Sequence, residues 1–222
     1  MLLLYHLWLD PHCRKVRLVL GEKKLDYEMR VEKVWERRAD FIALNPAGEV
    51  PVLIDEDGTR LAGSQPICEY LDEMYGNDSL IGQGAVVRAE VRRLVDWFDR
   101  KFVEEVTVNL VDEKITKRLL GFGEPNSKAV LAGLRNLHTH LQYITWLIDR
   151  RSWLGGEEMT LADLAAAGHL SCVDYLGDIP WEDYPAAKDW YARIKSRPSF
   201  RTLLADHIPG APPPPHYANL DF

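Results

Sequence analysis

The sequence predicts a two-domain protein in which a small α/β domain precedes an all-helical domain. Strand-like and helix-like segments alternate over about the first 80 residues, and long helical patterns fill most of the rest. A Gly-containing stretch, residues 76–82, separates the two patterns. We therefore divide the chain into residues 1–78, residues 84–207 and a Pro-rich tail, residues 208–222.

The first domain begins with a continuous apolar run, residues 2–7, which is typical of a central strand covered on both faces. Pro11 starts a helix that ends near residue 21, and residues 25–31 form a second strand. A short helix over residues 36–44 precedes a hairpin of residues 52–54 and 60–62 around an Asp-Gly turn. Ser64 is the expected N-cap of a last helix. The order β-α-β-α-β-β-α is thioredoxin-like.

The segment that leads into the hairpin, NPAGEVPVL from Asn45 to Leu53, predicts a docking surface for an extended peptide. Proline has no N–H, so Pro51 belongs at the start of a strand, and the Val50–Pro51 bond is a candidate for the cis form. A cis turn there would point the N–H and C=O of Val50 outward. An extended backbone could then pair with both groups.

The second domain shows helical apolar spacing over residues 84–114, 127–150, 160–176, 184–197 and 198–205. The segment 160–176 is apolar on nearly every side, which predicts a buried central helix. Thr160 and Asp163 fit the capping box that begins such a helix. His169 lies within this apolar segment and is interpreted as a hydrogen-bonded core residue.

The tail combines a polyproline-like stretch, residues 209–215, with a terminal segment that carries aromatic and charged side chains. Two interpretations stay open. The tail packs back on its own domain, or it is a tethered recognition peptide. In the second case Tyr217, Leu220 and Phe222 are the apolar anchors, and Asp221 adds charge.

Composition and charge exclude several classes of function. The chain is 46% hydrophobic with a net charge of −7, which argues against binding to nucleic acid or anionic membranes. Its three cysteines fit reduced thiols in a cytosolic protein. The apolar N-terminus is short and lacks a basic leader, and no segment is long enough to cross a bilayer. We expect a cytoplasmic protein without membrane insertion. His12 has no further ligands at metal spacing, so we also expect no metal.

Three signals, in order and at suitable spacing, resemble the cytosolic glutathione S-transferase family over residues 1 to about 207. They are the NPAGEVPVL run, the helix start GSQPICEYL from residue 63, and the TLAD box from residue 160. The resemblance implies the fold of that family. It also implies that any retained glutathione is held by Val50, Pro51, Gly63 and Ser64.

The same resemblance places two unusual residues in the expected site. Asp10 stands where the family has a hydroxyl or thiol that activates the glutathione sulfur. An ionised carboxylate has no proton to donate and repels a thiolate. Gly63 replaces an acidic or amide side chain, and losing one charge-assisted bond costs about 1.5–3 kcal/mol. We expect no catalytic residue and weak or absent glutathione binding. The alternative is a glutathione-dependent transferase acting on a small electrophile.

Cys13 is the other candidate for chemistry. It lies in the predicted first turn of a helix beside Arg14 and Lys15, where a thiol pKa is lowered. A redox role would follow from that environment. We prefer the interpretation of a small residue facing the core, because the family's cysteine aligns with Asp10 instead.

Residues 33–38, 43–53 and 67–73, together with the tail, resemble the FzlA family of glutathione S-transferase-like division proteins in alphaproteobacteria. This implies a non-catalytic homodimeric scaffold that binds filaments of the tubulin-like GTPase FtsZ at the division site, and a tail that contacts another division protein. Trp35 and Arg38 are candidates for partner binding, because Trp and Arg are typical of interface hot spots. The alternative for Trp35 is partial burial against the sheet.

Overall fold

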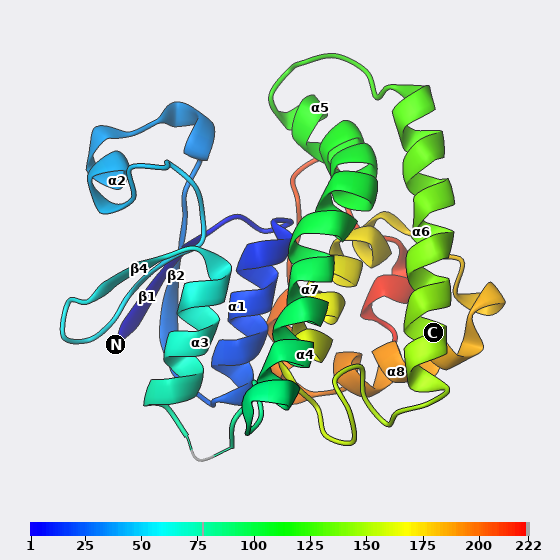
Figure 1. Ribbon diagram of the computed structural model, residues 1–222. Helices are drawn as coiled ribbons and strands as arrows, with labels where there is room; N and C mark the ends of the chain where they lie inside the picture. Colours follow the sequence, from blue (N-terminus) through cyan, green and yellow to red (C-terminus); the bar gives the residue numbers. More distant parts are fainter. Residues whose placement is uncertain (77, 221–222) are drawn as a thin grey trace.

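The computed structural model describes residues 1–76 and 78–220 and shows a small sheet domain packed against a larger helical domain (Figure 1). The elements of the first domain are β1 (Leu2–His6), α1 (Pro11–Glu22), β2 (Tyr27–Val31), η1 (Val34–Glu36), α2 (Ala39–Leu44), β3 (Val52–Ile54), β4 (Arg60–Ala62) and α3 (Ser64–Met74). The predicted order and both strands of the hairpin are confirmed. The expected helix over residues 36–44 is instead a 3-10 turn, η1, followed by the shorter α2.

The sheet has the strand order β2-β1-β3-β4, with β1 parallel to β2 and the other pairs antiparallel. Leu2 and Leu4 of β1 point into the main core, whereas Tyr5 packs with Phe41 and Val52 in a second, smaller core. Helices α1 and α3 lie between the sheet and the helical domain, and α2 lies on the far side (Figure 1). Both faces of β1 are therefore covered, as its apolar run predicts.

The remaining elements form the helical domain and the tail. They are α4 (Ala85–Asp96), η2 (Trp97–Thr116), α5 (Lys117–Leu119), α6 (Ser127–Ile148), α7 (Leu161–Leu176), η3 (Trp181–Asp183), α8 (Pro185–Lys195), η4 (Pro198–Phe200), α9 (Arg201–Leu204) and η5 (Pro215–Ala218). The helix expected over residues 84–114 continues to residue 119, and its η2 part follows a wider, π-helical turn. Within the described residues, no helix combines the length and apolar character needed to cross a bilayer.

Helix α7 forms the centre of the helical domain. Every residue from Leu161 to Tyr175 is buried, which confirms the predicted central helix. The capping box is present, and the Asp163 carboxylate accepts the Thr160 N–H at 2.9 Å. A Cβ atom at Gly168 would lie 3.0 Å from the backbone nitrogen of Lys15. Glycine at this position therefore allows α7 to pack closely against α1 of the other domain.

Buried ion pairs also join α1 to the end of the helical domain. Asp206, which follows α9, accepts hydrogen bonds from Arg14 at 2.9 Å and from Arg17 at 2.8 Å. The three side chains are at most 1% exposed. Removing one partner of such a pair leaves an uncompensated buried charge, which costs about 3–5 kcal/mol. The relative position of the two domains is thus fixed by polar as well as apolar contacts.

Candidate functional site

The structure brings together the starts of α1, α3 and β3, the three places where the sequence predicts glutathione-site residues. The carbonyl of Pro51 accepts the Gly63 N–H at 3.1 Å, which joins the start of β3 to the start of α3. His12 in the first turn of α1 lies 3.2 Å from Ser64, measured from Nδ1 to Oγ. Residues far apart in the sequence therefore border one site.

The Val50–Pro51 bond is cis, as the sequence predicts. Asn45 shapes the preceding loop, because its side chain donates to the Glu49 carbonyl at 2.9 Å and accepts the Ala47 N–H at 3.2 Å. Among the described residues, no hydrogen bond uses the N–H or C=O of Val50. This backbone is therefore available to a second extended chain.

The prediction that Ser64 caps α3 is wrong. Gly63 is the N-cap, with a φ of 87° that glycine adopts readily, and Ser64 is the first helical residue. The Ser64 side chain is buried and contacts His12 instead of the helix backbone. A glutathione carboxylate would have to compete with His12 for this hydroxyl, and Gly63 offers it no side chain.

Asp10 has a structural role at the expected activating position. It is the N-cap of α1, and its carboxylate accepts the Cys13 N–H at 2.7 Å. Burial raises the pKa of Asp10, although His12 and the hydrogen bonds from Cys13 oppose this effect. The raised pKa weakens the prediction that this carboxyl is always ionised. The carboxyl group still differs from an activating group, because one of its oxygens accepts the hydrogen bond that caps the helix.

Cys13 is a buried core residue with no exposed surface. Burial and the neighbouring Asp10 raise the pKa of its thiol well above the usual value, so the nucleophilic thiolate is disfavoured. The adjacent cations do not reverse this, because Arg14 bonds to Asp206 and Lys15 bonds to Asp99. The core interpretation of Cys13 is confirmed.

A polar cluster between the domains was not predicted. Asp99 of η2 accepts a hydrogen bond from Lys15 and lies 3.0 Å from His169 and 3.7 Å from His12. Burial alone would raise the pKa of Asp99, but Lys15 and the two histidines outweigh it and lower that pKa. No local sequence signal could reveal the cluster, because its members come from three separate helices. The interpretation of His169 as a hydrogen-bonded core residue is confirmed.

The cluster also corrects the prediction that His12 lacks further metal ligands. The ligand atoms of His12, Asp99 and His169 lie within 4.8 Å of one another. Burial lowers the pKa of both histidines, which favours their neutral, ligating form. The Lys15 ammonium already compensates the Asp99 charge, however, and this disfavours a second cation beside it. The arrangement is best described as an ion-pair network that joins the domains.

Trp35 and Arg38 lie on the loop between β2 and α2. The Trp35 side chain is 44% exposed and belongs to neither hydrophobic core. The indole is thus partly covered, and nearly half of its surface remains open to a partner. Arg38 forms two hydrogen bonds with the buried carboxylate of Glu32, at 2.7 and 3.2 Å, and one with Asp40 at 3.1 Å. Of the two candidates, Trp35 presents the larger unpartnered surface.

The tail packs back on its own helical domain. Tyr217 has no exposed surface, accepts a hydrogen bond from Arg14 at 3.1 Å and donates one to the Leu203 carbonyl at 3.1 Å. The prediction of Tyr217 as a partner anchor is therefore wrong in this conformation, because its ring fills an internal space. Leu220 is 42% exposed, and the candidates Asp221 and Phe222 lie outside the described residues.

Comparison with known proteins matches this arrangement. The family models for the glutathione S-transferase N-terminal and C-terminal domains match residues 11–74 and 110–198. FtsZ-localized protein A of Caulobacter vibrioides is 48% identical over 223 residues, which cover 99% of this chain and 97% of that protein. The chain belongs to the glutathione S-transferase family.

Two solved structures within this glutathione S-transferase family are similar over the whole chain. A glutathione S-transferase from Rhodospirillum rubrum F11 has a TM-score of 0.98 and 57% identity, with 100% of both chains covered. FzlA from C. crescentus has a TM-score of 0.96 and 46% identity, and covers 100% of this chain and 99% of its own. The resemblances that the sequence shows to the glutathione S-transferase family and to the FzlA family are both confirmed.

Proposed function

We propose that the chain is a non-catalytic cell division protein that binds FtsZ filaments in the cytoplasm, at the division site. The observation that carries the proposal is the 48% identity, along nearly all of both chains, to a protein named for its localisation with FtsZ. The site supports a role without catalysis. Asp10 caps a helix, Gly63 has no side chain, and the Ser64 hydroxyl contacts His12.

The proposed contact surface is the loop that carries Trp35. Its half-exposed indole lies outside both cores, and a partner could bury it at little conformational cost. The Val50 backbone and Arg38 would extend this surface. Arg38 contributes less, because Glu32 and Asp40 already offset its charge.

Co-sedimentation with polymerised FtsZ tests the proposal. We expect the wild-type chain to pellet with the filaments at micromolar concentration and the Trp35→Ala variant to lose at least about tenfold in affinity, or about 1.4 kcal/mol. Phe122→Ala is the matched control, because Phe122 is 71% exposed on the loop between α5 and α6. A wild-type chain that stays in the supernatant would refute the proposal. Equal losses in both variants would remove Trp35 from the contact surface.

We also propose a homodimer, since a two-fold dimer would present two filament-binding surfaces and could bridge neighbouring filaments. An aromatic pair on α6, of which Trp146 is half-exposed, offers an area for self-association. Trp146 is 49% exposed and stacks with Tyr143 at a centroid distance of 6.2 Å. Sedimentation velocity of the wild type and of the Trp146→Glu variant measures the oligomeric state directly. A wild-type monomer at tens of micromolar would contradict the dimer.

The second candidate is a glutathione-dependent transferase, favoured by the unpartnered Val50 backbone and by the similarity to the R. rubrum protein. Calorimetric titration with glutathione distinguishes the two candidate functions. Under our proposal, glutathione binds no tighter than millimolar, because Gly63 and the engaged Ser64 weaken the site. Sub-millimolar binding with turnover of an electrophile would establish the transferase instead.

A further inference from the structure

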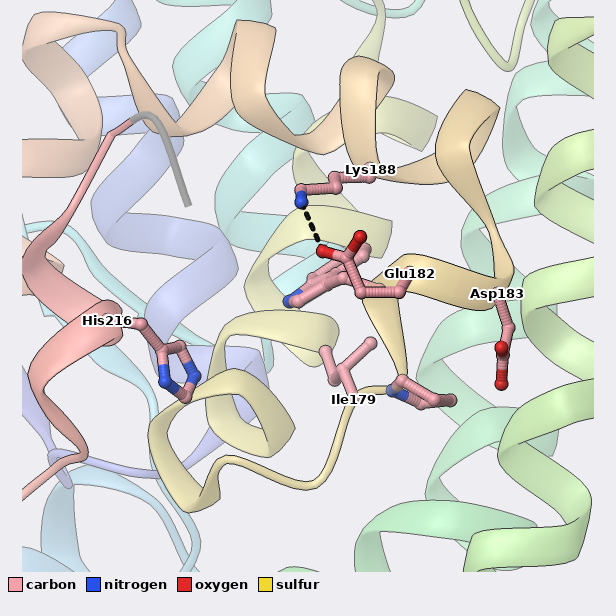
Figure 2. A pocket seen from close by; sticks show the side chains of 7 residues that line it. Ile179, Glu182, Asp183, Lys188 and His216 are labelled. Carbon is pink, nitrogen blue, oxygen red and sulfur yellow. Dashed lines mark hydrogen bonds and ion pairs between the residues drawn. The ribbon is translucent and has the colours of Figure 1, made fainter.

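The largest feature outside the proposed contact surface that a figure shows closely is a cavity on the helical domain, and its charges favour no class of ligand. Its volume is about 320 Å³, and it lies between η3, the start of α8 and the tail. Figure 2 shows Lys188 donating to the Glu182 carboxylate, with Asp183 and His216 elsewhere on the border. Acidic and basic groups thus share one small space. The outer edge of the sheet carries a more specific pattern.

Strand β2 forms one edge of the sheet and leaves its outer backbone groups unpaired. The strand order is β2-β1-β3-β4, so β2 pairs on one side only, with β1. The Glu32 N–H donates to the His6 carbonyl at 3.0 Å, so the even-numbered residues of this segment direct their backbone groups toward β1. Tyr27, Met29 and Val31 therefore direct their N–H and C=O groups outward. Among the described residues, no hydrogen bond uses these outward groups.

The sequence of β2 is complementary to a second copy of the same strand. If two copies run antiparallel about a two-fold axis at Met29, this residue faces itself, and Tyr27 faces the second copy's Val31. These are the residues with outward backbone groups, so each facing pair exchanges two hydrogen bonds. The positions between them place Glu28 opposite the second copy's Arg30. Opposite charges at facing positions stabilise a strand pair.

The side chains of this edge are accessible to such a copy. Those of Arg30 and Glu28 are 50% and 52% exposed, and they approach each other at 3.6 Å within one chain. Arg30 also donates to the Tyr5 hydroxyl at 3.2 Å. In the two-fold arrangement the four charges alternate in sign, so the contacts within each chain are kept. Val31 is 41% exposed, and pairing would cover this apolar side chain with a tyrosine.

We propose that β2 is a self-association surface at which two copies of this chain join their sheets through antiparallel β2 strands. The contact is only five residues long on each side, well below the standard interface of about 1,600 Å², so it is weak and forms where chains are concentrated. Helix α6 lies on the opposite side of the molecule from the sheet (Figure 1). A chain that also self-associates through α6 would therefore link two neighbours and extend the assembly.

Disulfide trapping on the full chain tests the register of this pairing. Facing residues of a hydrogen-bonded antiparallel pair have Cα atoms about 5.5 Å apart, which a disulfide can span. The two copies of residue 31 would instead be about 13 Å apart along the strands, which is too far. Under mild oxidation with copper phenanthroline, we expect Met29→Cys to form covalent dimers at least about tenfold faster than Val31→Cys.

Val31→Cys is the matched control, because residue 31 lies on the same strand and is exposed, whereas Met29 is only partly so. The three natural cysteines are buried. Non-reducing gel electrophoresis measures both rates. Equal rates for the two variants would overturn the proposal.

Charge reversal provides a second readout, measured by sedimentation equilibrium in the Trp146→Glu background so that α6 does not contribute. Glu28→Arg places arginines opposite each other at both symmetric positions and should weaken self-association by at least about tenfold. The double variant Glu28→Arg/Arg30→Glu restores opposite charges and should recover it. Arg60→Glu, on the other edge strand β4, is the matched control and should behave as its parent. A loss that the double variant does not recover would refute the antiparallel pairing.

Met29→Pro identifies any other occupant of this edge. Proline removes an N–H that points away from β1, and an edge strand tolerates this change. Self-association should weaken as it does in Glu28→Arg. A variant that self-associates like the wild type but no longer pellets with FtsZ would assign the edge to a strand of the filament and overturn the proposal. The trapping and charge-reversal measurements do not involve FtsZ, so they stand apart from the proposed function.

Discussion

Trp35 and Tyr217 are two aromatic residues with the same predicted role and opposite structural positions. Trp35 lies on the loop between β2 and α2, is 44% exposed and belongs to neither core. Tyr217 lies near the end of the chain and is fully buried, with its hydroxyl bonded to Arg14 and to the Leu203 carbonyl. An aromatic residue in a polar segment therefore indicates an anchor, but not whether the anchor holds a partner or the protein itself.

The largest expected effect comes from removing the internal anchor. Tyr217→Ala should lower the free energy of unfolding by about 3–5 kcal/mol, because it leaves a cavity and removes a partner of the buried Arg14. Urea denaturation measures the change. Tyr217→Phe keeps the ring and should cost only about 1–3 kcal/mol. A loss below about 1 kcal/mol for the alanine variant would abolish the contrast with Trp35.

A pH titration sharpens the comparison, because a buried histidine near Arg14, Arg17 and Asp206 resists protonation. Burial and the charge of Arg17 lower the pKa of His6 to about 4, from 6.5. The unfolded chain then binds the proton more tightly than the folded one. The free energy of unfolding should therefore fall as pH decreases from 6.5 to 4, by up to about 3 kcal/mol for this residue. His6→Leu should reduce the dependence of the free energy of unfolding on pH, measured by denaturation at several pH values in this range. An unchanged pH dependence would exclude His6 as its source.

The smallest expected effect on stability belongs to Trp35. Trp35→Ala should change the free energy of unfolding by less than about 0.5 kcal/mol, because the side chain is 44% exposed and belongs to neither core. The same variant should lose FtsZ binding, so function and stability separate at this residue. A stability loss comparable to that of Tyr217→Ala would show that Trp35 is also an internal anchor.

Much of the fold could be predicted from the sequence because local signals determine it. The hairpin around Asp57 and Gly58 and the Thr160 capping box each depend on residues only a few positions apart. The start of α3 was predicted one residue late, at Ser64, because serine is the more favoured N-cap although glycine is also accepted. The positive φ of Gly63, set by the chain path from β4, decides between them.

The site was harder to predict, because its interactions join distant parts of the chain. Asp99 and His169 approach His12 only after α7 packs on α1 through Gly168. The pKa of Cys13 changes in the opposite direction to the one its sequence neighbours suggest, since burial outweighs them. The charges of Arg14 and Lys15 are directed at carboxylates of the other domain, and the sequence does not reveal those partners.

The hydrogen bond between Arg14 and Tyr217 has a consequence for the order of folding. The two residues are 203 positions apart in the sequence, so their contact closes a very long loop. Closing such a loop costs conformational entropy before the contact stabilises the chain, and the local sheet of the first domain can form earlier. Pulsed hydrogen exchange during refolding should consequently protect the amides of β1 before the amides around Tyr217.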